Sequence, residues 1–194
     1  MRATSVNGPT RQPPDVTTLI RALEDAGVNY VVTGSAAAML HGVSLVPGDL
    51  DITPALDVEN LTRLVGVLES IEARQDPTAP FGHWEQQDDG EKHWIETAPT
   101  PEAVAARASW SPNPADPASF DHLLRSRHGA LDVVPEVSGT YEELITRAVP
   151  LEVDGLRVWV ESISELLATL TVPRREKDRD RVDQLRALQR VDPS

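Results

Sequence analysis

The stretch Tyr30-Val31-Val32-Thr33-Gly34-Ser35 carries an apolar, partly β-branched run directly into a Gly-Ser pair. Such a run predicts a short buried strand, and residues 36–41, which Gly42 follows, predict a short helix. Glycine allows close backbone approach, and a helix N-terminus offers free N–H groups and the positive end of its dipole. Gly34 and Ser35 are therefore candidates for holding phosphate, although a Gly-Ser pair is also an ordinary helix cap.

The next predicted strand, residues 49–53, contains two acids in the run Asp49-Leu50-Asp51-Ile52. Side chains two positions apart on a strand face the same way, so Leu50 and Ile52 can face the core while Asp49 and Asp51 point out together. Neighbouring carboxylates repel each other unless a cation or a proton compensates, and an oxygen-rich site suits Mg²⁺. Taken alone, an Asp-x-Asp in an acidic protein is more often surface decoration.

A third acid, Asp132, interrupts the apolar run Gly129-Ala130-Leu131-Asp132-Val133-Val134. This run predicts the second strand of a hairpin, after a first strand over residues 122–126 and a turn at His128-Gly129. Burying an unpaired acid is costly, so Asp132 either reaches an exposed face or serves a function. We predict that Asp132 joins Asp49 and Asp51 in one metal-binding carboxylate cluster.

Together these three features resemble the nucleotidyltransferase superfamily related to DNA polymerase β: a strand-Gly-Ser-helix unit, an Asp-x-Asp on the next strand and a lone Asp on a later strand. The resemblance covers residues 28–52 and 129–185. The second block is similar to small bacterial members, including nucleotidyltransferase toxins of type IV toxin–antitoxin and abortive-infection systems. It implies a mixed β-sheet core flanked by helices.

The resemblance also implies a role for each motif residue. Gly34 and Ser35 would hold the β- and γ-phosphates of the nucleotide, and Asp49 and Asp51 would bind two Mg²⁺ ions. Asp132 would bind the catalytic metal and help to activate the attacking hydroxyl. The product would be a nucleotide joined to the acceptor, with pyrophosphate released.

The sequence departs from the superfamily pattern in two places. Members often carry Arg and Thr just before the Asp-x-Asp, where this chain has Leu45-Val46-Pro47-Gly48, and toxin-like members often carry Lys at the position of Leu170. The usual C-terminal Arg-x-Lys-Asp is present as Arg175-Glu176-Lys177-Asp178. Lys177 and Arg181, four residues apart on a predicted helix, are candidates for phosphate contact; the alternative is a solvated helix face.

The remaining patterns predict an α/β (α+β) domain with a C-terminal helical end. Residues 1–14 are expected to be a disordered N-terminus, residues 15–161 the core with an irregular insertion at about 76–121, and residues 162–194 the C-terminal helices. Short strands are expected near residues 92–97 of the insertion. Further predicted helices cover residues 15–26, 57–73, 141–148, 162–170 and 176–189, and a predicted hairpin turns at Asp154-Gly155.

Composition and charge limit the kinds of site, location and partner that the protein is expected to have. The chain has 194 residues and no cysteine, which excludes disulfides and thiolate zinc sites. No export signal or membrane-spanning run is recognisable, so a cytoplasmic protein is expected. Its 18 basic and 31 acidic residues give a formal charge of −13. This charge opposes general nucleic-acid coating, without excluding an RNA substrate, and suits a basic protein partner.

These observations predict a Mg²⁺-dependent nucleotidyltransferase that moves a nucleoside monophosphate from a nucleoside triphosphate onto a hydroxyl of RNA, such as a tRNA 3′ end, or of a protein. The toxin of a toxin–antitoxin pair, with an antitoxin protein as partner, is the expected setting. Two alternatives stay open. One is an antibiotic nucleotidyltransferase acting on aminoglycosides, and the other is a non-catalytic relative that binds a nucleotide or a partner.

Overall fold

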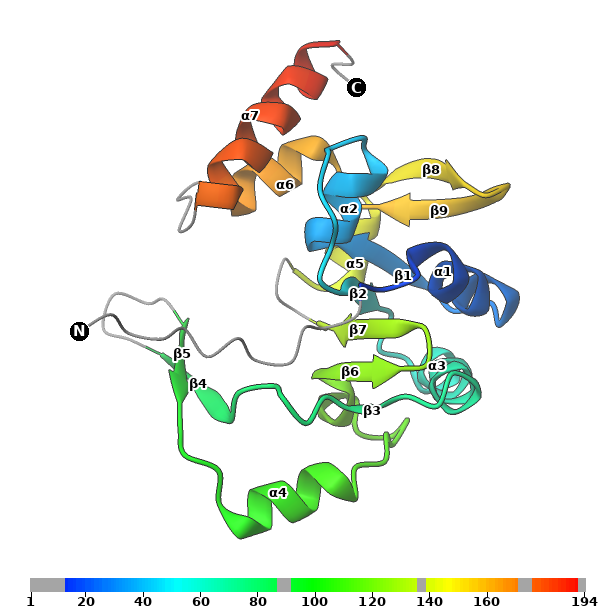
Figure 1. Cartoon of the computed structure of the whole chain (residues 1–194). Coiled ribbons are helices and arrows are strands. Elements are labelled where there is room, and N and C mark those ends of the chain that lie inside the picture. The colour runs from blue at the N-terminus through cyan, green and yellow to red at the C-terminus, as the bar shows by residue number, and fades with distance from the viewer. Residues whose placement is uncertain (1–12, 87–91, 136–138, 171–175, 192–194) are drawn as a thin grey trace, which may run out of the picture.

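The computed structural model describes residues 13–86, 92–135, 139–170 and 176–191, and its centre is a seven-stranded sheet (Figure 1). The strands are β1 (Tyr30–Thr33), β2 (Leu50–Pro54), β3 (Arg74–Gln75), β6 (His122–Ser126), β7 (Gly129–Val133), β8 (Val149–Val153) and β9 (Leu156–Val160). Their order is β3-β6-β7-β2-β1-β9-β8. Strand β1 runs antiparallel to β2 and parallel to β9, whereas β2 runs parallel to β7. The mixed sheet predicted from the sequence is confirmed.

The helices around this sheet match the predicted ones, with ends that differ by up to three residues. They are α1 (Val16–Asp25), α2 (Gly34–Leu40), α3 (Val58–Ser70), α5 (Tyr141–Ile145), α6 (Ile163–Thr169) and α7 (Glu176–Val191). The Asp15 side chain caps α1 by accepting the Thr18 N–H at 3.0 Å. Gly27, with a φ of +64°, follows the end of that helix in the left-handed conformation that glycine tolerates. Sequence therefore specifies this helix at both ends.

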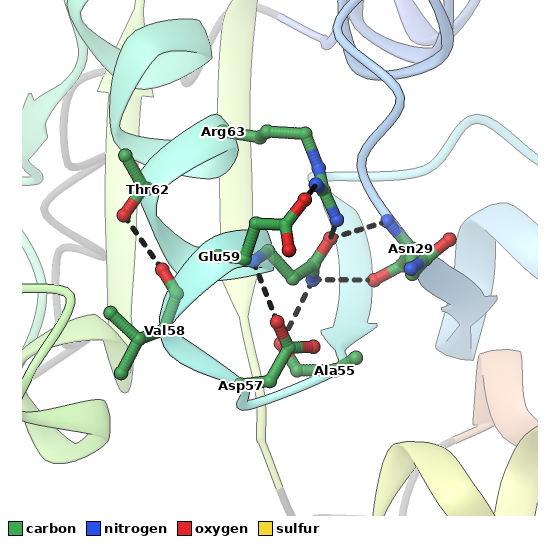
Figure 2. Close-up of polar contacts among 8 residues, drawn as sticks. Asn29, Ala55, Asp57, Val58, Glu59, Thr62 and Arg63 are labelled. Carbon is green, nitrogen blue, oxygen red and sulfur yellow. Dashed lines mark hydrogen bonds and ion pairs between the residues drawn. The ribbon is translucent and has the colours of Figure 1, made fainter.

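Hydrogen bonds tie the start of α3 to Asn29, in the loop that leads into β1, and to Ala55; Figure 2 labels both residues. The Asn60 side chain is fully buried. It accepts the Asn29 N–H at 2.7 Å and donates to the Asn29 and Ala55 carbonyls at 2.9 and 2.8 Å. Buried polar groups need partners of this kind, and here they fix α3 at the end of β2.

One hydrophobic core joins the sheet to α1 and α3, which contact each other. The residues that alternate with the acids on β2 belong to it, since Leu50 and Ile52 are fully buried. Because side chains alternate along a strand, burying Leu50 and Ile52 makes Asp51 point to the opposite face of β2, away from the core.

The insertion at residues 76–121 is more regular than the sequence predicts. It contains the hairpin β4 (Gly82–Gln86) and β5 (Lys92–Glu96), helix α4 (Pro101–Ala108) and the 3-10 turn η1 (Pro117–Phe120). Strand β5 confirms the expected strand near residues 92–97. Helix α4 is unpredicted because it buries none of its residues and so carries no clear apolar stripe. In Figure 1 it lies away from the central sheet.

The C-terminal helices α6 and α7 pack against each other at the end of the sheet where α2 lies (Figure 1). Ser162 caps α6 by accepting the Glu165 N–H at 3.3 Å, which is one half of the predicted capping box. Leu185 anchors α7 in the core, where it is fully buried. Within the described residues, no helix has the length and apolar character that crossing a membrane requires.

Candidate functional site

Three carboxylates meet on adjacent strands of the central sheet. Asp51 on β2 and Asp132 on β7 are register partners across a parallel strand pair. Asp49 lies just before β2, and its carboxylate reaches the same side as the other two. One carboxylate oxygen from each acid lies within 4.8 Å of the other two. The structure thus brings together the three acids that the sequence suggests as a metal site.

The electrostatics of this cluster leave it short of positive charge. Burial, together with the negative charges of Asp49 and Asp132, raises the pKa of Asp51 to about 8. The Ser35 backbone N–H and the Arg181 charge act to lower that pKa, but they do not prevail. A divalent cation would relieve this repulsion, and three carboxylate oxygens are the donor set that a hard cation such as Mg²⁺ prefers.

The Gly34–Ser35 turn lies directly beside this cluster. Strand β1 ends at Thr33, which is the register partner of Asp51, and Gly34 follows with a φ of +66°. A Cβ atom at Gly34 would lie 2.9 Å from Cγ of Asp51 and closer still to Oδ2. The Ser35 backbone N–H donates a hydrogen bond to the Asp51 carboxylate. Only glycine fits at this position, for reasons of both conformation and space.

A fourth acid, Glu161, contacts the same turn and is absent from the sequence-based candidates. It follows the last residue of β9 and is 1% exposed. Its Oε2 accepts the Gly34 N–H at 3.2 Å. Burial raises the pKa of Glu161, while the Gly34 N–H acts to lower it. The sequence signal, an acid ending an apolar run, gains its meaning only from the parallel pairing of β9 with β1.

The two predicted cations of α7 differ in what the structure describes of them. Arg181 is half-buried, its charge acts on Asp51, and its Nε is buried without a hydrogen-bond partner among the described residues. Lys177 belongs to helix α7, but the structure describes only its backbone. Leu170 ends α6 and packs half-buried against the core, so that position directs no cation into the site.

No protein-family model matches the chain, and no curated protein matches its sequence. Among solved structures, a solution structure of the antibiotic-resistance factor ANT(2″)-Ia matches 90% of this chain and 83% of its own, at 14% identity and a TM-score of 0.49. A crystal structure of ANT(2″)-Ia with adenylyl-2″-tobramycin matches 89% and 91%, at 14% identity and 0.47. An antigenic nucleotidyltransferase-like protein from Paracoccidioides brasiliensis matches 91% and 74%, at 14% identity and 0.46.

At these identities and TM-scores the likeness assigns no activity, which has to come from the residues of this chain itself. The structures found include nucleotidyltransferases and nucleotidyltransferase-like proteins.

Proposed function

We propose that the chain is a Mg²⁺-dependent nucleotidyltransferase that moves a nucleoside monophosphate from a nucleoside triphosphate onto an acceptor hydroxyl. One observation carries this proposal: Asp51 and Asp132 are register partners, Asp49 shares their face, and the Gly34–Ser35 turn adjoins them. Carboxylates held this close repel each other strongly, so their close grouping has a ready explanation in cation binding.

The chemistry follows from the residues around the cluster. Asp49, Asp51 and Asp132 would hold two Mg²⁺ ions, which when bound neutralise charge on the phosphate oxygens. Asp132 would accept the proton of the attacking hydroxyl. The acceptor oxygen then forms a bond to the α-phosphorus while the bond from that phosphorus to the bridging oxygen of the β-phosphate breaks. Pyrophosphate leaves with the electron pair of that bond.

The triphosphate would be bound by Gly34 and Ser35 and by the cations of α7. The Gly34 and Ser35 N–H groups already contact Glu161 and Asp51. The Ser35 hydroxyl makes no hydrogen bond to a carboxylate of the described residues, so it is the group of this turn that would donate to phosphate. Arg181 brings a positive charge toward the cluster from α7, which compensates for the neutral Leu170. Lys177 lies one helical turn before Arg181 and would extend this cationic side.

We propose an RNA 3′ end, such as that of a tRNA, or a protein hydroxyl as the acceptor, and a toxin–antitoxin pair as the setting. The formal charge of −13 favours a second candidate, because it would attract a cationic acceptor such as an aminoglycoside. It also favours a basic antitoxin protein as partner. A relative that binds nucleotide without transferring it is the remaining alternative.

The deciding experiment follows label from each α-labelled nucleoside triphosphate, with Mg²⁺, into total RNA, cell protein or aminoglycosides. The matched variants are Asp132→Asn, which neutralises one acid of the cluster, and Asp25→Asn, which neutralises an exposed acid at the end of α1. Label in one fraction with the wild type and Asp25→Asn, but not with Asp132→Asn, would support the transferase and identify the acceptor. Mg²⁺-dependent nucleotide binding without transfer would support the non-catalytic alternative, and absence of both would refute the proposal.

A further inference from the structure

Glu161 contacts the end of β1, the start of α2 and the residue that ends α2. Its backbone N–H donates to the Val32 carbonyl at 2.8 Å, beside the parallel pairing of β9 with β1. Its carbonyl oxygen lies 2.8 Å from Nε2 of His41, the residue that ends α2. Its Oε2 accepts the Gly34 N–H at the start of α2. One residue therefore holds the strand end, the turn and the end of the following helix.

The Glu161 side chain is poorly suited to a purely structural role. Its Oε1 is buried and has no hydrogen-bond partner among the described residues. The charged residues that act on it are Glu165 and Arg147, which pair with each other at 3.2 Å. A buried carboxylate oxygen without a partner costs free energy, and an apolar side chain would avoid that cost. The acid is retained here at the expense of stability, which is typical of a residue that serves a site.

The bond from Glu161 continues to the acidic cluster through two adjacent peptide groups. Gly34 donates to Glu161, and the next N–H, that of Ser35, donates to Asp51. The two N–H groups thus contact carboxylates just after β9 and on β2, the two strands that flank β1. Rotation of the turn about its own axis would break one of these bonds, so Glu161 restricts the orientation of Ser35 relative to Asp51.

We propose that Glu161 is a positioning residue for the reaction: by holding the Gly34 N–H it fixes the turn that presents Ser35 to the metal-bound nucleotide. This role rests on the proposed nucleotidyltransferase function. In this role Glu161 acts through the Gly34 N–H rather than by contact with metal or nucleotide. Residues that orient a ligand group in this way commonly contribute about 10- to 100-fold to metal affinity or activity.

The test compares Glu161→Ala, Glu161→Gln and Val158→Ala in the full chain. The glutamine retains an uncharged oxygen that can accept the Gly34 N–H. Val158 is fully buried on β9, the strand that Glu161 follows, and serves as the control for lost packing. Two measurements are made on each protein. One is the dissociation constant with which the protein binds a Mg²⁺–nucleoside triphosphate complex, using the triphosphate that the wild type binds best. The other is the chemical shift of the Gly34 and Ser35 amide resonances in NMR spectra.

We expect Glu161→Ala to weaken nucleotide binding about 10- to 100-fold and to move both amide resonances. Glu161→Gln should stay within about threefold of the wild type, because the accepted bond survives. Val158→Ala should lower thermal stability without either effect. Equal binding by Glu161→Ala and Val158→Ala, or a glutamine variant as weak as the alanine variant, would overturn the positioning role.

The outcomes also separate this inference from the proposed function. If the wild type binds no nucleoside triphosphate with Mg²⁺, the nucleotidyltransferase proposal fails, and with it the catalytic purpose assigned to Glu161. If the wild type binds nucleotide but the Gly34 and Ser35 resonances of Glu161→Ala stay unchanged, the function stands and the positioning role is refuted.

Discussion

The carboxyl of Asp51 keeps its proton to an unusually high pH in the metal-free chain. Burial, with the charges of Asp49 and Asp132, raises its pKa to about 8, whereas an aspartate in an unfolded chain has a pKa of about 3.9. Between these values the folded chain holds a proton that the unfolded chain has released. The contribution of Asp51 to the stability of the metal-free protein therefore falls as the pH rises from about 4 to about 8.

This shift predicts how Mg²⁺ and pH act together. Since Mg²⁺ needs ionised carboxylates, its binding competes with the proton on Asp51. We expect Mg²⁺ to raise the melting temperature more at about pH 8.5 than at about pH 5.5, measured by differential scanning fluorimetry. Asp51→Asn, which cannot ionise, should remove most of the difference. An equal increase at both pH values in the wild type would contradict the cation site.

The site has no room for a side chain at position 34, where the residue is glycine. Gly34→Ala would force alanine into a positive φ, at a cost of about 1 kcal/mol, and press its Cβ against the Asp51 carboxylate. We expect Mg²⁺ affinity, measured by calorimetry, to fall by about tenfold or more. Gly48→Ala is the matched control, because a Cβ there meets no atom within 4 Å. Equal affinities for the two variants would show that Asp51 can move aside without consequence.

At the scale of elements, local signals proved more informative than composition. The Asp154-Gly155 turn joins β8 to β9 as predicted, with φ values of +52° and +79° that favour these residue types. Helix α4 gave no such signal because its residues stay unburied, although Thr100 caps it and Pro101 begins it. Strand pairing was also unpredictable, because the partners of β1 are chosen by contacts between segments far apart in sequence.

Asn60 links the start of α3 to Asn29 and Ala55, which makes Asn60→Leu a sharp test of how that helix end is held. Leucine has a similar volume but cannot accept the Asn29 N–H, and it cannot donate to the Ala55 carbonyl. The Asn29 carbonyl keeps its bond from the Ala55 N–H. We expect the free energy of unfolding to fall by about 2–4 kcal/mol in urea titrations, since buried groups lose their partners.

The control for Asn60→Leu lies one residue earlier on the same helix. Glu59→Gln breaks only the exposed pair with Arg63, so the loss should stay below about 0.5 kcal/mol. A loss of similar size in both variants would mean that α3 is held by its apolar face alone.

At the scale of the molecule, the candidate site is assembled from segments that the sequence separates widely. The Asp49 and Asp51 spacing and the lone acid Asp132 could be recognised from the chain because an acid in an apolar run is conspicuous. Glu161 could not be recognised, because nothing local reveals that β9 ends beside the Gly34 turn. Residues near a site are predictable when their own pattern is unusual, and unpredictable when only their neighbours make them matter.

The net charge of the molecule predicts that added salt raises thermal stability but weakens Mg²⁺ binding. With 18 basic against 31 acidic residues, the folded chain is destabilised by repulsion between its own charges, and salt screens that repulsion over a Debye length of about 10 Å at 0.1 M. Raising NaCl in metal-free buffer at about pH 8 should therefore increase the melting temperature, while sucrose at equal osmolality controls for solvent effects. The same screening weakens the attraction between the acidic cluster and Mg²⁺, so the Mg²⁺ dissociation constant should rise with salt. If NaCl increased both the melting temperature and the affinity for Mg²⁺, the result would contradict the view that the acidic cluster attracts the cation through its charge.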